Sequence, residues 1–149
     1  MVTITVTPEY GYVAGAILST FYLNLFQATK VSGARKAAKI DYPQLYAEKS
    51  EAAASEAALK FNCAQRAHQN TLENLPMVLG STVVAATRCP TFAASTLGVW
   101  VIARALYTIG YCTGDPKKRN YLGAAVIGSL SALTLLATAT YAAVKIVLA

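Results

Sequence analysis

Histidine and cysteine are scarce in this 149-residue sequence, which holds one histidine and three cysteines. The single histidine, His68, argues against a metal site, because no second imidazole is present to share the ion. The cysteines, Cys63, Cys89 and Cys112, lack the spacings that are typical of metal sites, and an odd number leaves at least one of them unpaired if any bridge forms. We therefore predict free, buried thiols and no bound metal.

Charged residues are missing from four long stretches of the chain. A membrane-spanning helix needs about 20 largely apolar residues. The first and last stretches are long enough alone, whereas the middle two need polar neighbours, including Arg104, to reach that length. The apolar fraction of 55 % points in the same direction. The four stretches are residues 10–29, 74–87, 89–103 and 120–144. They predict an all-α integral membrane protein, a bundle of four transmembrane helices.

The amino end, MVTITVTPEYGYV, shows no signal peptide. No basic region precedes its first apolar run, and no small-residue cleavage site follows that run. The net charge of +6 does not indicate nucleic-acid binding either, because the basic residues lie at predicted helix ends rather than along one soluble face. We expect the first helix to be retained and no nucleic-acid partner.

The chain is predicted to form a single domain, 1–149, with helices over about 8–30, 55–87, 91–112 and 120–146. Pro8 suits a helix start. Strong helix formers around Ser55 place the start of the second helix there. Charged connections with glycine and proline separate the first helix from the second and the third from the fourth, and the tetrapeptide RCPT is typical of a tight reversal between the second and third.

Lysine and arginine are divided unequally between the two ends of this predicted bundle. The opposite end, which would hold both termini, has only Arg88 and Lys145. The positive-inside rule then places both basic loops in the cytosol and both termini across the membrane. The basic residues of the two loops and their flanks are Lys30, Arg35, Lys36, Lys39, Lys49, Lys60, Lys117, Lys118 and Arg119.

Residues 61–76, FNCAQRAHQNTLENLP, concentrate polar side chains on one predicted membrane helix. An ionised side chain costs about 2.5–3.5 kcal/mol in the middle of a membrane helix, so it normally faces protein or a wet cavity. With a helical period of 3.6, Arg66, Asn70 and Glu73 fall within an arc of about 60°. His68 lies about 200° around the helix from Arg66 and should face a different neighbour.

Arg104, Tyr107 and Tyr111 form a similarly narrow stripe on the third predicted helix. The two stripes together could offer guanidinium, carboxylate, amide and phenol groups to a polar ligand near the cytosolic side. The alternative is an internal ion pair between Arg104 and Glu73 that only joins the two helices. Residue chemistry alone leaves both interpretations open.

Residues 61–76 resemble the signature of the membrane-associated proteins in eicosanoid and glutathione metabolism, the MAPEG family, and specifically its microsomal glutathione S-transferase type 3 branch. The likeness continues in order through EYGYV at 9–13, SGARKAAKIDYPQLY at 32–46 and RALYTIGYCTGDPKKR at 104–119. The resemblance implies four-helix protomers joined as a homotrimer in the endoplasmic-reticulum membrane, with glutathione held between neighbouring protomers and facing the cytosol.

The resemblance also implies roles for individual residues. His68 matches a polar residue that reaches the ligand of the adjacent protomer, and Asn74 departs from the tyrosine of leukotriene-forming relatives. Arg119 is the best match to the arginine that activates the thiol, although a one-residue length difference leaves Lys118 open. The matches to glutathione-binding positions are Arg35, Arg66, Asn70, Glu73, Tyr107 and Tyr111. Arg104 joins this set through its place on the polar stripe.

The implied activity is glutathione-dependent transfer to lipophilic electrophiles, or reduction of lipid hydroperoxides. A free thiol of this kind has a pKa of about 8.5 and is mostly protonated at neutral pH. A nearby guanidinium would favour the thiolate of glutathione, because its positive charge stabilises the anion. The second substrate would be apolar and enter from membrane lipid. A non-catalytic lipid-binding scaffold of the same superfamily is the main alternative, and retention of Arg66, Asn70 and Glu73 speaks against it. A small multidrug transporter fits Arg104 and the long basic loop poorly.

Overall fold

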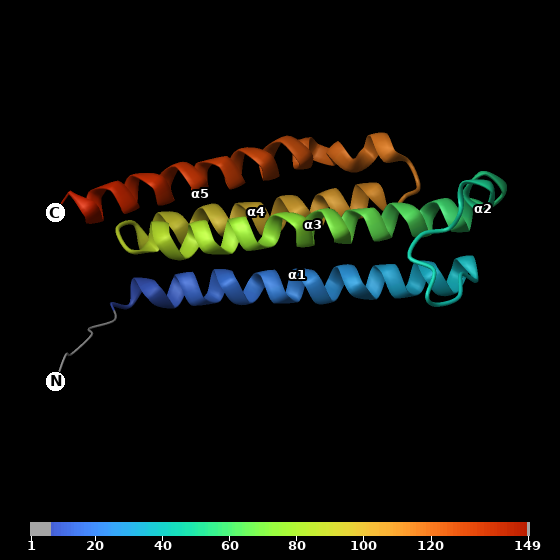
Figure 1. Ribbon diagram of the computed structural model, residues 1–149, viewed down its shortest axis with the longest axis horizontal. Coiled ribbons are helices and arrows are strands. Elements are labelled where there is room, and N and C mark those ends of the chain that lie inside the picture. Colours follow the sequence, from blue (N-terminus) through green and yellow to red (C-terminus); the bar gives the residue numbers. More distant parts are fainter. Residues whose placement is uncertain (1–6, 149) are drawn as a thin grey trace.

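Four long helices lie side by side in the computed structural model, which describes residues 7–148 (Figure 1). The amino-terminal residues 1–6, on which the absence of a signal peptide was predicted, lie outside the described residues. The long helices are α1 (Glu9–Ala38), α3 (Glu56–Ala86), α4 (Pro90–Tyr111) and α5 (Ala124–Val147). A short helix α2 (Lys49–Ala54) precedes α3, and the 3₁₀ segment η1 (Pro116–Gly123) links α4 to α5.

The connections are grouped at the two ends of the bundle. The α1–α2 loop, α2 and η1 lie at one end, whereas the reversal between α3 and α4 lies at the other end, near the start of α1 and the end of α5 (Figure 1). At that second end, Arg88 Nη2 donates to the carbonyl oxygen of Lys145 over 3.2 Å. The two basic connections therefore share one end of the bundle, as the charge distribution predicts.

The start of α3 agrees with the prediction, whereas the end of α1 does not. Ser55 is the N-cap of α3, and its hydroxyl accepts a hydrogen bond from the backbone N–H of Ala58 over 3.4 Å. Helix α1 was expected to end near residue 30 but continues to Ala38. Lys39 closes it in the left-handed conformation (φ 55°), and its N–H bonds to carbonyls of the last turn. The charged segment after residue 30 therefore extends the helix instead of forming a loop.

Small side chains allow the helices to pack closely around a few large ones. Trp100, Leu97, Leu135 and Val78 are almost completely buried at the centre of the main core cluster. Alanines such as Ala85 surround them. The core therefore joins all four long helices, including α1, whose Val13 and Leu23 belong to the same cluster.

Large apolar side chains cover the outside of the bundle. Two helical segments in residues 7–148 are long and apolar enough to cross a membrane: Pro90–Tyr111, and Pro116–Val147, which runs from η1 through α5. Helix α1 was also expected to be apolar enough to cross a membrane, because residues 10–29 carry no charge. It is not among these segments, because Asn24, Gln27 and its tyrosines lower the mean hydropathy of that stretch. The exposed apolar residues include Leu18, Phe21, Leu25, Ile102, Leu130 and Leu133.

Candidate functional site

A half-exposed ion pair marks one face of α3. Arg66 Nη1 lies 2.9 Å from Glu73 Oε1, and each side chain is 45 % exposed. The two residues are about two helical turns apart, so they share a face as the sequence predicts. An exposed ion pair contributes little to stability. Because the pair is weak and half-exposed, a ligand that carries a carboxylate and an amine could reach both charges.

Arg104 does not pair with Glu73, so the alternative of an internal ion pair between these helices is wrong. It is only 7 % exposed. Its Nη2 donates to Asn70 Oδ1 over 2.9 Å, and its Nε and Nη2 both donate to Thr71 Oγ1 over 3.0 Å. This bond to the amide oxygen fixes the orientation of the Asn70 side chain. The NH₂ group of the same amide can still donate to another acceptor.

Gln27 of α1 completes this buried network, and it was not among the predicted site residues. Its Nε2 donates to Thr71 Oγ1 over 2.8 Å and to Thr108 Oγ1 over 2.7 Å, and the side chain is fully buried. Thr108 in turn donates to the carbonyl of Arg104 over 2.8 Å. The only sequence signal was a lone glutamine in a charge-free stretch. The network ties α1, α3 and α4 together directly behind Asn70.

The predicted tyrosine stripe of α4 forms beside this network. The Arg104 guanidinium lies 4.2 Å from the centre of the Tyr107 ring. The rings of Tyr107 and Tyr111 are 5.5 Å apart and nearly perpendicular, an arrangement that aromatic pairs favour. Tyr107 is buried, whereas Tyr111 is partly exposed. The phenols and the buried guanidinium therefore form one continuous cluster.

Segment η1 brings Lys118 and Arg119 to the end of this cluster. Both residues are exposed. Gly110 makes the close docking of η1 on α4 possible: a Cβ placed on Gly110 would lie 2.8 Å from Tyr121 Cβ and nearer still to the carbonyl oxygen of Lys118. The position of η1 therefore depends on a residue without a side chain.

His68 and Arg35 lie elsewhere in the chain. The His68 ring nitrogen Nε2 is 3.1 Å from Asn24 Oδ1 on α1, which agrees with a helix face different from that of Arg66. Arg35 is 8 % exposed and donates to the carbonyl of Gln44 over 2.7 Å. Within residues 7–148, neither residue joins the Arg66–Glu73 pair.

Tyr46, in the loop before α2, is a further polar residue near Arg66 that was not among the predicted site residues. Its hydroxyl donates to Gln69 Oε1 on α3. Burial raises the pKa of Tyr46, and the nearby Arg66 guanidinium opposes that rise. Asn62 fixes the same loop by bonding both the N–H and the carbonyl of Ala47, over 2.8 and 2.9 Å. Tyr46 is the last residue of the segment IDYPQLY, and nothing in that segment indicated a hydrogen bond to Gln69.

The MAPEG family model matches residues 13–139, which is nearly the whole chain and includes every candidate residue from Arg35 to Arg119. The chain belongs to the MAPEG family. MAPEG proteins are membrane-bound and associated with glutathione and lipophilic substrates. The family includes glutathione transferases and peroxidases as well as non-catalytic members.

The cysteines of this MAPEG chain are free thiols, as predicted, but only Cys63 is buried; Cys89 and Cys112 are partly exposed. Within residues 7–148, no group of three or more histidine, cysteine, aspartate or glutamate side chains is arranged to hold a metal ion. The polar side chains that gather around α3 and α4 carry guanidinium, amide, carboxylate and phenol groups.

Arg35 stabilises the basic end of this MAPEG chain, which leads to a stability prediction. Its guanidinium donates to carbonyls of the α1–α2 loop and lies 4.3 Å from the Tyr42 ring and 4.5 Å from the Phe61 ring. Arg35→Met should lower the free energy of unfolding by about 1–3 kcal/mol, because buried carbonyls lose their donor. Thermal denaturation in detergent measures the change. Lys36→Met, at the exposed neighbouring position, is the control, and equal stability of the two variants would contradict the assignment.

Proposed function

We propose that this protein is a glutathione transferase with glutathione peroxidase activity, of the microsomal glutathione S-transferase type 3 branch. Its second substrates would be lipophilic electrophiles and lipid hydroperoxides. The observation that carries the proposal is the half-exposed Arg66–Glu73 pair beside the Asn70 amide, which Arg104 holds in one orientation. Glutathione has two carboxylates and an amine, and charge-assisted hydrogen bonds would match those groups to this set.

The fit of glutathione follows from the donors and acceptors that are present. The Arg66 guanidinium would bind a carboxylate, the Glu73 carboxylate would accept from the amine, and the free NH₂ of Asn70 would donate to a second acceptor. Tyr107 and Tyr111 close the same cluster from α4. His68 lies on another face of α3, and we assign it to the ligand of the neighbouring protomer in a homotrimer. Arg35 is held under the α1–α2 loop of its own chain, and its assignment to the same ligand follows from the family resemblance. Arg104 supports the site through Asn70.

The chemistry needs the thiol as a thiolate, and Arg119 is the residue we assign to this role. A guanidinium near the sulfur stabilises the anion and lowers the pKa of the thiol. In conjugation, the thiolate forms a bond to an electrophilic carbon, and the group displaced or opened takes up a proton. In peroxide reduction, the thiolate sulfur bonds to the outer oxygen as the O–O bond breaks, which gives the sulfenic acid and an alkoxide, and the alkoxide takes up a proton to leave as an alcohol. A second glutathione then converts the sulfenic acid to a disulfide and water.

The architecture that fits this chemistry is a single membrane domain in which all four long helices cross the bilayer. Exposed leucine, isoleucine and phenylalanine side chains on the outside of the bundle support contact with lipid. The two basic connections at one end support a cytosolic location for that end. The proposed location is the endoplasmic-reticulum membrane or another intracellular membrane, with both termini on the opposite side.

Glutathione binding in detergent provides the direct test. Glutathione should raise the thermal midpoint of the purified protein, and Arg66→Leu should weaken its binding about 10- to 100-fold, because a hydrogen bond to a charged group is lost. Arg88→Leu removes an exposed arginine at the opposite end of the bundle and serves as the control. Unchanged affinity in the Arg66 variant would remove this pair from the proposed site.

An activity assay distinguishes an enzyme from a non-catalytic lipid-binding scaffold. The purified protein would be given glutathione with either a lipid hydroperoxide or a model electrophile. We expect turnover of both. A protein that binds the lipid but shows neither a glutathione-dependent thermal shift nor turnover would be a scaffold, and the proposed function would be wrong.

A further inference from the structure

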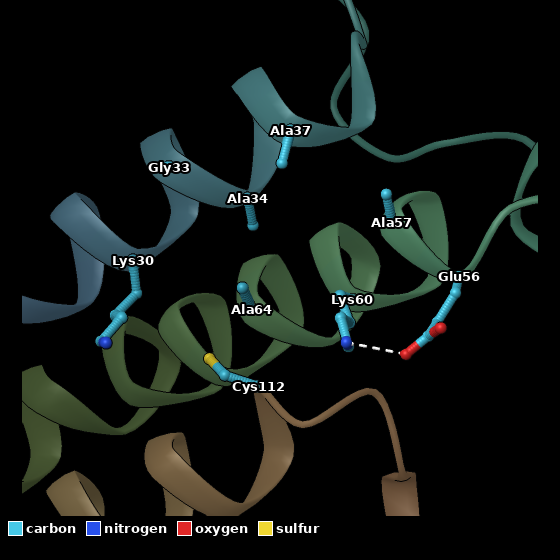
Figure 2. A pocket seen from close by; sticks show the side chains of 9 residues that line it. All are labelled: Lys30, Gly33, Ala34, Ala37, Glu56, Ala57, Lys60, Ala64 and Cys112. Atoms are coloured by element: carbon cyan, nitrogen blue, oxygen red, sulfur yellow. Dashed lines mark ion pairs between the residues drawn. The ribbon is translucent and has the colours of Figure 1, made fainter.

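A groove lies between α1 and α3 at the basic end of the bundle, where both helices extend past the end of α4 (Figures 1 and 2). Its volume is about 510 Å³. Small residues make up most of its lining, including Gly33 on α1 and Ala64 on α3, and Cys112 after α4 also borders it. Figure 2 shows Lys30 and Lys60 at this groove, reaching from the two facing helices.

The two lysines along the groove differ in whether they are paired with a carboxylate. Lys60 Nζ is 2.7 Å from Glu56 Oε1, so that lysine is already paired on its own helix. Lys30 has no ion pair within residues 7–148; its ammonium lies 5.6 Å from the centre of the Phe26 ring. The groove therefore carries one unpaired positive charge, and a second positive charge would become available if Glu56 were neutralised.

The groove continues along α1 toward the charge-free part of the helix. A neighbouring depression of about 580 Å³ shares Lys30, Gly33 and Ala34 with it and adds Phe26 and Thr29. Lys30 is the first charged residue after the charge-free stretch 10–29. A lysine in this position lies at the level of lipid headgroups, with apolar surface below it and water above.

This groove is separate from the Arg66–Glu73 site. It involves the face of α3 that carries Lys60 and Ala64, and Arg66 is about 200° further around the helix than Ala64. Neither Glu73 nor Arg119 borders the groove. A ligand in the groove would therefore leave the proposed glutathione site open.

We propose that this groove binds the phosphate of an anionic glycerophospholipid, with Lys30 as its main partner. Basic pockets between membrane helices on the cytosolic side suit anionic lipid headgroups. Lys60 provides a second, partly neutralised charge, and the small residues between the two lysines leave room for the headgroup. The depression beside Phe26 and Thr29 would take the beginning of an acyl chain.

Lipid titration of the purified full-length protein in detergent tests the charge requirement. Dioleoylphosphatidylglycerol should raise the thermal midpoint and remain bound in native mass spectra. Lys30→Gln should weaken this binding about five-fold, the effect of one lysine near an anionic headgroup. Glu56→Gln should tighten it about two-fold, because Lys60 is released from its ion pair. Lys49→Gln, which removes an exposed charge on α2, should leave the affinity unchanged.

A variant at Gly33 tests the space. A Cβ at Gly33 would have nothing within 4 Å, so Gly33→Leu can fill the groove without a clash in the fold. It should reduce lipid binding while the thermal shift with glutathione stays at the wild-type size. Equal effects of Lys30→Gln and Lys49→Gln would overturn the proposal. Equal binding of dioleoylphosphatidylcholine would also overturn it, as would inorganic phosphate producing the whole stabilisation.

Discussion

Arg119→Ala is expected to lower kcat about 100-fold at saturating glutathione, with either a lipid hydroperoxide or an electrophile as second substrate. The guanidinium is exposed on η1, and η1 packs on Gly110 of α4, the residue before Tyr111 of the polar cluster. Without it, the thiol of bound glutathione would keep a pKa near that of a free thiol, about 8.5, and remain mostly protonated at neutral pH. The activity remaining in the variant should therefore rise with pH up to that value.

Lys118→Ala is the matched control for this experiment, because Lys118 is the adjacent cation on the same segment. We expect it to retain most of the wild-type turnover. The reverse result, a large loss in the Lys118 variant and none in the Arg119 variant, would move the role by one residue. If neither change alters kcat, η1 does not stabilise the thiolate and the proposed chemistry lacks its cation.

Gly110→Ala should have the second largest effect, acting through the position of η1. A Cβ at this position would meet Tyr121 Cβ at 2.8 Å and the carbonyl oxygen of Lys118 even closer, so η1 must move. Overpacking of this kind costs about 1–3 kcal/mol. Because η1 carries Lys118 and Arg119, kcat should fall together with stability. Thermal denaturation and steady-state turnover measure the two effects.

Gly98→Ala distinguishes this displacement from a general effect of glycine replacement. Gly98 lies on the same helix, and a Cβ there has nothing within 4 Å. Alanine also has a higher helix propensity than glycine, so this variant should be as stable as wild type or slightly more stable, with unchanged turnover. Equal loss of activity in both variants would contradict the close docking of η1 on α4.

Local signals in the sequence predicted the helices well where capping decides their ends. The start of α3 was placed near Ser55 because strong helix formers surround that residue, and Ser55 is its N-cap, with a hydroxyl that accepts from the N–H of Ala58. The end of α1 was missed because Gly33 and the following charges are typical of a connection. The guanidinium of Arg35 folds back on the loop carbonyls, and Lys39 adopts the left-handed cap. Neither effect is visible in a local pattern.

The sequence predicted which site residues share a helix face, but not which residues on other helices they would bond. Helical periodicity placed Arg66 and Glu73 on one face of α3, and they form an ion pair there. Periodicity could not show that Arg104 would bond Asn70 and Thr71, because the alignment of α4 against α3 depends on core packing. Gln27 was missed for the same reason, since its partners come from two other helices.

The length of α1 has a consequence for how two reactants of opposite solubility can meet. Its 30 residues rise about 45 Å, whereas the hydrocarbon layer is about 30 Å thick. In the proposed membrane arrangement, about 15 Å of helix at the basic end would therefore project into the headgroup region and the water beyond, unless the helix tilts strongly. A peptide dissolved in the cytosol could then approach from above, while an oily reactant diffuses in sideways from the bilayer. Neither would have to leave its preferred medium before contact.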